Sequence, residues 1–238
     1  VLSPDWHFGA AARAGAITWG SGGTGVAGAI GASNSLVGSK ANCEVGSGGI
    51  ARLTNGNYVV ASPAWDADFA SNAGAATWAN GTAPLTGYLS AANSLVGSKT
   101  DDAVAIGGIT ALNNGNYVVL SPNWSNGHAT GVGAATWGSG ATGLSGEVTS
   151  LNSLVGSKTG DHVASGGVQA LISDNYVVVS PNWDNGGIDN AGAATWGNGL
   201  LGGKGAISPL NSLIGARAGD MVGSEGVTAL ANGNYVVA

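Results

Sequence analysis

The sequence predicts an all-β repeat fold, a four-bladed β-propeller, from an internal repeat, four short strand signals in each repeat and a tight Asn-Gly turn. The tyrosines of a recurring Asn-Gly-Asn-Tyr-Val-Val phrase lie 59 residues apart, and two sets of tryptophans have the same step. Such a period is the signature of a repeat architecture, so residues 1–238 are predicted to form a single domain. The recurring residues are Tyr58, Tyr117, Tyr176 and Tyr235; Trp6, Trp65, Trp124 and Trp183; and Trp19, Trp78, Trp137 and Trp196.

Each repeat carries four short stretches that are rich in β-branched or aromatic residues and bounded by Gly, Asn or Pro, as strands are. In the first copy these are residues 15–19, 34–39, 45–53 and 58–62. The last two flank an Asn-Gly turn, which tolerates positive φ and predicts an antiparallel hairpin. Four short antiparallel strands per repeat are typical of a propeller blade. No stretch has a 3.6-residue apolar period, so almost no helix is expected.

The blades are predicted at approximately residues 45–98, 104–157 and 163–216, with a fourth built from residues 222–238 plus 1–39. The recurring phrase is divided between Ala238 and Val1. Pairing of the N- and C-terminal segments in one sheet is therefore expected to close the ring and remove exposed edges. Val1 is not an initiator methionine, so a processed or trimmed N-terminus is also expected.

Composition excludes several classes of protein. A net charge of −6 and a pI near 4.7 disfavour nucleic acid and anionic membranes as partners. No apolar run approaches the ~18 residues that span a bilayer, so membrane insertion is not expected. The single cysteine, Cys43, has no metal-ligand spacing and stands where other repeats have Asp102, Asp161 and Asp220. No metal or cofactor is expected, and these aspartates are expected to cap turns.

The tryptophans that follow Ser-Pro are the candidate ligand-binding residues. They lie just past a strand end, where an aromatic face can stack on a sugar ring and nearby Asn or Asp can bind hydroxyl groups. The alternative is that each tryptophan covers a blade edge, and the sequence leaves both open. The Thr-Trp tryptophans are expected to pack between blades. The candidate ligand-binding residues are Trp6, Trp65, Trp124, Trp183, Asp5, Asp66, Asn123, Asn182 and Asp184.

Catalysis finds no support in the sequence. His7, His128 and His162 occupy three different repeat positions, so they form no repeated constellation. No nucleophile elbow, metalloprotease helix motif or P-loop is present. The chain is predicted not to be an enzyme.

Several phrases resemble the FG-GAP repeat of integrin-type β-propellers, in order and spacing. They are Ser157-Lys-Thr-Gly-Asp161, Ala164-Ser-Gly-Gly-Val168, Tyr176-Val-Val-Val-Ser-Pro181 and Ala191-Gly-Ala-Ala-Thr-Trp-Gly197. The resemblance covers the whole chain and implies a propeller, although that family usually has seven blades. Its Asp-rich calcium loop is replaced by Thr54-Asn-Gly-Asn57, so calcium binding is not implied. The sequence of the repeat also resembles repeats of bacterial filamentous-haemagglutinin-type surface proteins, and this resemblance implies export and adhesion.

These observations predict a secreted or cell-surface binding protein with repeated sites, a lectin or adhesin whose partners are glycans or glycoconjugates. Repetition would convert weak affinity at single sites into avidity. The alternative is a structural or protein-binding adhesion module without a small-molecule site. A homodimer is a further possibility that the sequence leaves open.

Overall fold

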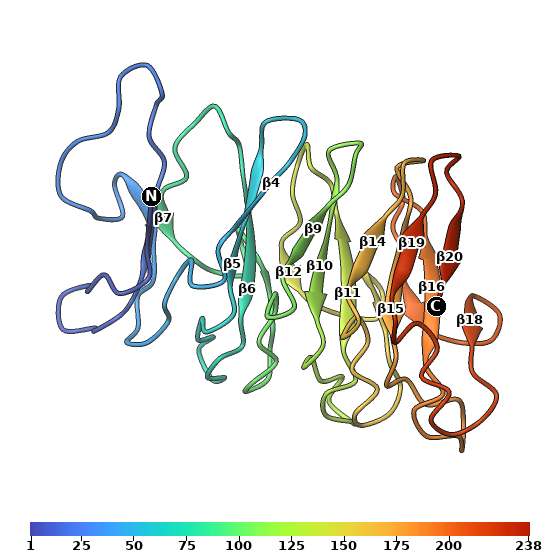
Figure 1. Cartoon of the computed structure of the whole chain (residues 1–238). Helices are drawn as coiled ribbons and strands as arrows, with labels where there is room; N and C mark the ends of the chain where they lie inside the picture. Colours follow the sequence, from blue (N-terminus) through green and yellow to red (C-terminus); the bar gives the residue numbers. More distant parts are fainter. The chain divides into compact units, whose positions relative to one another are not determined.

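A computed structural model describes all 238 residues, which form two compact units. The first unit comprises residues 1–106 and 140–147, and the second comprises residues 107–139 and 148–238. Both are built from short strands and turns and neither contains a helix, which confirms the all-β prediction (Figure 1). No helix with the length and apolarity of a membrane span is present.

The first unit holds two sheets. The four-stranded sheet has the order β1 (Leu2–Ser3), β2 (Ala16–Thr18), β3 (Ser35–Val37) and β7 (Gly87–Tyr88). The five-stranded sheet has the order β12 (Gly146–Glu147), β8 (Leu95–Val96), β6 (Ala75–Ala79), β5 (Tyr58–Ser62) and β4 (Ile50–Arg52).

The second unit holds three sheets. The five-stranded sheet has the order β17 (Gly205–Ala206), β13 (Ser153–Val155), β11 (Ala134–Gly138), β10 (Tyr117–Ser121) and β9 (Ile109–Ala111). The four-stranded sheet has the order β14 (Val168–Ala170), β15 (Tyr176–Ser180), β16 (Ala193–Gly197) and β18 (Ser212–Ile214). The last sheet is the hairpin of β19 (Val227–Ala229) and β20 (Tyr235–Val237).

The four predicted strands of a repeat form one antiparallel sheet. In the blade predicted at residues 45–98, β4, β5, β6 and β8 pair successively, with Tyr58 opposite Arg52 on one side and Ala79 on the other. The Asn-Gly turn closes the first hairpin, where the Leu53 amide donates to the Asn57 carbonyl at 2.9 Å and Gly56 has φ of +88°. This turn needs the left-handed conformation that glycine adopts without strain. The hairpin prediction is confirmed.

A short parallel strand, which the sequence did not predict, joins three of the five sheets to the following repeat. β7 pairs in parallel with β3, placing Gly87 opposite Leu36. β12 pairs in the same way with β8, and β17 with β13. These strands are two residues long and carry no alternation of apolar and polar residues, so they give no strand signal.

The two terminal segments each pair locally: β1 pairs with β2, and β20 pairs with β19 across an Asn-Gly turn. Their pairing with one another, which the sequence predicts, stays a prediction, because they belong to different units. The four-bladed propeller itself stays a prediction, because the strand pairing establishes the separate sheets but does not establish that they form a closed ring.

Burial follows the central strands. The valines of the first three Tyr-Val-Val phrases are buried, whereas Val236 of the last is 52% exposed. In the same cores a threonine of the Thr-Trp strand meets a serine of the next strand. Thr136 Oγ1 lies 2.7 Å from Ser153 Oγ, so two buried hydroxyl groups satisfy each other. This pairing offsets the cost of burying polar atoms.

Some glycines allow consecutive repeats to approach at backbone distance. Gly133 (φ +75°) bridges in parallel to Val163 of the next repeat, and a Cβ on Gly133 would lie 2.2 Å from the Val163 amide nitrogen. Gly108 has a similar φ of +89° with open space around it. Comparing substitutions at these two glycines therefore distinguishes the cost of a left-handed backbone from the cost of a steric clash.

We predict that Gly133→Ala lowers the free energy of unfolding far more than Gly108→Ala. Both substitutions add the left-handed strain of about 1–2 kcal/mol. Only Gly133→Ala also forces two backbones apart, for a further loss of about 3 kcal/mol. Denaturant unfolding followed by tryptophan fluorescence measures both, and equal losses would contradict the prediction.

Candidate functional site

The Ser-Pro tryptophans are core residues in three of the four repeats. Trp65, Trp124 and Trp183 are only 8%, 5% and 3% exposed. Each begins a turn fixed by two backbone hydrogen bonds; the Trp65 amide donates to Ser62 at 3.1 Å, and Gly74 donates to the Trp65 carbonyl at 2.9 Å. Burial of these three side chains favours packing, the alternative that the sequence left open. A repeated stacking site on these residues stays a prediction.

The fourth member, Trp6, is half-buried, and its ring centroid lies 5.9 Å from that of Phe8. The centroid of Phe8 in turn lies 5.7 Å from that of Tyr88 in an edge-to-face arrangement. Trp6 thus belongs to a small aromatic cluster in the first unit. The neighbouring candidate Asp5 instead pairs with Arg13, its Oδ1 lying 3.1 Å from Nε.

The remaining polar candidates for ligand binding fall into two groups, aspartates that accept hydrogen bonds within their own loops and asparagines on the surface or partly buried. Asp66 Oδ1 accepts the amide of Asn72 at 2.7 Å, and Asp184 Oδ1 accepts the amide of Asn190 at 2.8 Å. Asn123 is exposed and Asn182 is half-buried. These residues therefore do not form one repeated binding constellation.

One cavity of about 370 Å³ does bring two candidates together, in the first unit. Trp65 and Asp66 line it with Asp68, the fully exposed ring of Phe69, and Lys40. Lys40 Nζ donates to the Ala67 carbonyl at 2.6 Å and lies 3.4 Å from Asp68 Oδ1. An open aromatic ring beside carboxylate and ammonium groups can hold a small polar ligand with an apolar face.

The Thr-Trp tryptophans have a role that the sequence did not predict. Trp78 is half-buried, and its indole N–H donates to the carbonyl of Gly140 in the following repeat at 3.0 Å. The same carbonyl accepts the side-chain amides of Asn55 and Asn57, each at 2.8 Å. We call this arrangement the glycine clasp. It recurs at Gly199, which accepts from Asn114, Asn116 and Trp137.

A sequence signal for the clasp exists. Every Thr-Trp is followed three residues later by Gly, in all four repeats. The recurring Asn-Gly-Asn motif supplies the other donors, with its two asparagines on either side of the turn glycine. Both motifs recur in the sequence, but the acceptor glycine lies more than 60 residues from its donors, beyond any local pattern.

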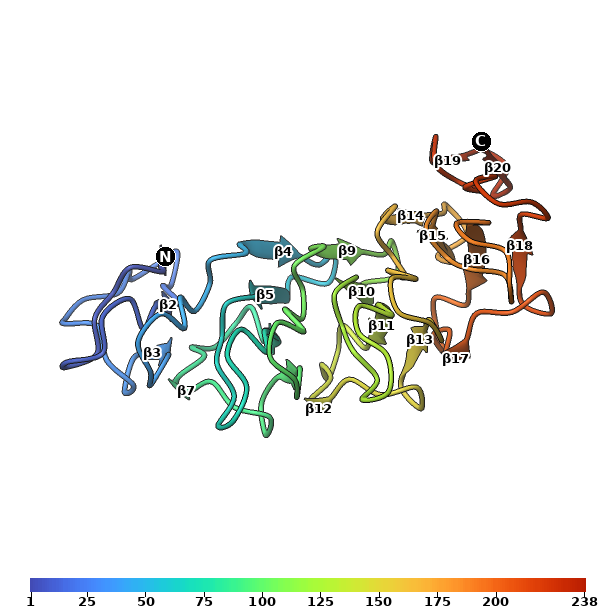
Figure 2. The same ribbon diagram turned by 90° about the horizontal axis from the view of Figure 1, so that it is seen from below.

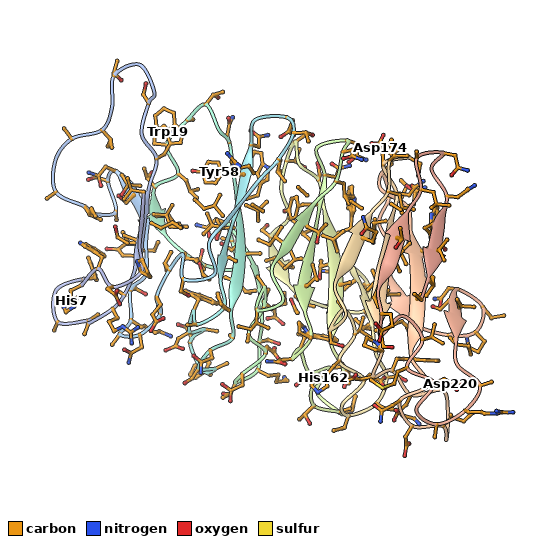
Figure 3. All side chains as sticks on the ribbon, in the orientation of Figure 1. His7, Trp19, Tyr58, His162, Asp174 and Asp220 are labelled. Carbon is orange, nitrogen blue, oxygen red and sulfur yellow. The ribbon has the colours of Figure 1, made fainter.

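The repeated aspartates cap turns, as predicted. Asp161 is fully buried, and its Oδ2 accepts the amides of Ser157 and Lys158 at 2.7 and 2.8 Å. Asp220 accepts the amides of Ala216 and Arg217 in the same way, at the position labelled in Figure 3. Cys43, at the equivalent position, is buried, and burial raises the pKa of its thiol.

No group of three or more His, Cys, Asp or Glu side chains is placed to hold a metal ion.

A family model described as a repeat of unknown function (DUF5650) matches residues 1–47, 52–106, 111–165 and 170–224. The chain belongs to this family. Successive DUF5650 matches after the first begin 59 residues apart, which is the period of the sequence. Comparison with curated proteins gave no match. Nothing in the DUF5650 match confirms the resemblance to FG-GAP or filamentous-haemagglutinin-type repeats.

We predict that the clasp of the DUF5650 repeat contributes measurably to stability. Trp137→Phe removes the indole N–H donated to Gly199 and is expected to lower the free energy of unfolding by about 1 kcal/mol. Trp196 occupies the same repeat position and its indole N–H has no acceptor. Trp196→Phe is therefore the matched control, and a comparable loss there would show that ring packing alone is responsible.

The turn-capping hydrogen bonds also set a pH dependence. The amides of Arg217 and Ala216 hold the pKa of Asp220 below its ordinary value. A lowered folded-state pKa gives stabilisation that is present above the ordinary carboxyl pKa of about 3.9 and is lost as pH falls through the lowered value. Asp220→Ala is expected to destabilise the chain near neutral pH, with the difference vanishing in acid. NMR titration of the carboxyl carbon checks the pKa, and Asp189→Ala, whose carboxylate accepts no hydrogen bond, is the control.

Proposed function

We propose that this chain is a non-enzymatic structural module of a secreted or surface-exposed protein, and that it acts through protein contacts. The observation that carries the proposal is the use of its most regular side chains. Three of the Ser-Pro tryptophans are buried in cores. Thr-Trp tryptophans and the asparagines of Asn-Gly-Asn donate hydrogen bonds between repeats. Arrays joined by nearest-neighbour contacts of this kind serve as extended scaffolds. The proposal does not depend on closure of a four-bladed propeller.

A second candidate is carbohydrate binding at the single cavity beside Phe69. It is favoured by one specific observation, a fully exposed aromatic ring next to Asp68 and Lys40. Sugar recognition commonly combines an apolar ring face with a few placed polar groups. The equivalents of Phe69 and Asp68 differ between repeats, so this candidate is proposed for one repeat.

A glycan array with the purified chain separates the two functions. The structural module predicts no retained glycan. Binding of a glycan that competes with free sugar would overturn that proposal and support the second.

If a glycan is retained, Phe69→Ala is expected to reduce binding at least about tenfold, because the stacking face is lost. Leu151→Ala, which truncates another highly exposed apolar side chain, is the matched control. Unchanged binding in Phe69→Ala would remove the cavity from consideration.

A further inference from the structure

The chain contains several Asn-Gly pairs, a dipeptide that can modify itself. The glycine amide nitrogen attacks the side-chain carbonyl carbon of the asparagine, and glycine, which has no Cβ, leaves the approach open. Three conditions favour the reaction: the attacking nitrogen donates to no acceptor, the side-chain amide nitrogen is free to leave as ammonia, and water reaches the site. The seven Asn-Gly pairs begin at Asn55, Asn80, Asn114, Asn126, Asn185, Asn198 and Asn232.

In five of these pairs the attacking nitrogen is already engaged. The pair at Asn55 is an example, because the Gly56 amide donates to the Leu53 carbonyl at 3.1 Å. The glycine clasp also holds its leaving group, since Asn55 Nδ2 donates to the Gly140 carbonyl at 2.8 Å. The engaged glycine nitrogens are those of Gly56, Gly81, Gly115, Gly199 and Gly233.

The pair at Asn185 meets only part of the requirement. The Gly186 amide donates to no acceptor within the chain. The leaving group is bound, however, because Asn185 Nδ2 donates to the Gly215 carbonyl at 3.3 Å. Loss of ammonia from Asn185 would therefore break a contact with the segment that follows β18.

The pair at Asn126 meets all three conditions. Asn126 and Gly127 are exposed and lie on the loop that joins β10 to β11, two strands labelled in Figure 2. Neither the Gly127 amide nitrogen nor Asn126 Nδ2 donates a hydrogen bond within the chain. The nucleophile and the leaving group are thus both free, and both are in contact with water.

The side-chain carbonyl of Asn126 is also polarised for attack. Its Oδ1 accepts the backbone amides of His128 and Ala129, each at 2.9 Å. Negative charge develops on Oδ1 when a nitrogen adds to Cγ, and two backbone N–H groups stabilise such a charge as they do in an oxyanion hole. Asn198 Oδ1 also accepts two backbone amides, but there the Gly199 nitrogen is engaged.

We propose that Asn126 is a self-modification site, at which the folded chain converts an asparagine into aspartate or isoaspartate. The Gly127 nitrogen bonds to Asn126 Cγ, the Cγ–Nδ2 bond breaks, and the proton displaced from the nitrogen leaves with the ammonia. The product is a succinimide ring. Water then adds its hydroxyl group to Cγ or to the main-chain carbonyl carbon, and the released nitrogen takes up the proton. The first route gives aspartate and the second gives isoaspartate.

The modification changes the surface of one repeat. A neutral amide becomes a carboxylate, which adds one negative charge to the net charge of −6. An aspartate at this position keeps the two amide hydrogen bonds and makes them charge-assisted. An isoaspartate instead lengthens the main chain of the loop. A protein partner that contacts the β10–β11 loop would therefore meet chemically different forms of the same chain.

Peptide mapping by mass spectrometry tests the site on the unmodified chain. One sample is incubated folded at neutral pH, and a second is incubated in denaturant, where the hydrogen bonds of the fold are absent. Folded Asn126 is expected to lose its amide at least about tenfold faster than folded Asn55, because Asn55 must first break two hydrogen bonds. Folded Asn126 is also expected to react no more slowly than unfolded Asn126. Equal folded-state rates at Asn126 and Asn55, or protection of Asn126 by folding, would overturn the proposal.

A pair of glycine variants tests the attacking atom. Gly127→Ala places a Cβ beside the nucleophile and is expected to slow the loss of the Asn126 amide at least about tenfold. Gly186→Ala makes the same change at the equivalent position of the next repeat and is the matched control, for which an unchanged rate at Asn126 is expected. An unchanged rate in Gly127→Ala would show that water attacks the side chain directly, and would overturn the proposal.

Discussion

The join between repeats rests on one carbonyl oxygen that receives three N–H groups. At Gly140 and Gly199 two asparagine amides and one indole converge on an acceptor in another repeat. A carbonyl has two lone pairs, so this acceptor is used to its full capacity or beyond. The parallel strands beginning at Gly87, Gly146 and Gly205 reinforce the same joins with backbone hydrogen bonds. Each repeat sheet is thus complete only when the next repeat contributes to it.

The dependence of each repeat on hydrogen bonds from its neighbour accounts for the low proportion of charged residues. With only 8% charged residues, the chain has few side chains for surface ion pairs, and three are present, all among partly exposed groups of the first unit. Exposed pairs of this kind contribute little to stability. Neutral amides, hydroxyl groups and glycine carbonyls do the joining instead. Glycine at the bridging positions lets backbones approach to distances that any side chain would forbid.

The two tryptophan sets exchange the roles that their sequence context suggested. Trp124 follows Ser-Pro at the start of a loop, a place typical of ligand contacts, yet it is buried and its indole N–H has no partner. Trp137 lies within a strand, a place typical of packing, yet it stays half-exposed and donates across a repeat boundary. A buried donor without a partner carries a desolvation cost, so Trp124 is retained for its volume.

The 59-residue period, the four antiparallel strands, the Asn-Gly hairpin and the turn-capping role of Asp161 all follow from the order of the amino acids. These depend on local rules: turn geometry, β propensity and side-chain hydrogen bonds to nearby amides. The short parallel strands such as β7, the clasp at Gly140 and the burial of Trp65 are visible only in the folded chain. The parallel strands and the clasp connect residues that are far apart along the chain, and their acceptors are backbone carbonyl groups that every residue possesses. Residue type carries no record of which distant carbonyl a donor will meet.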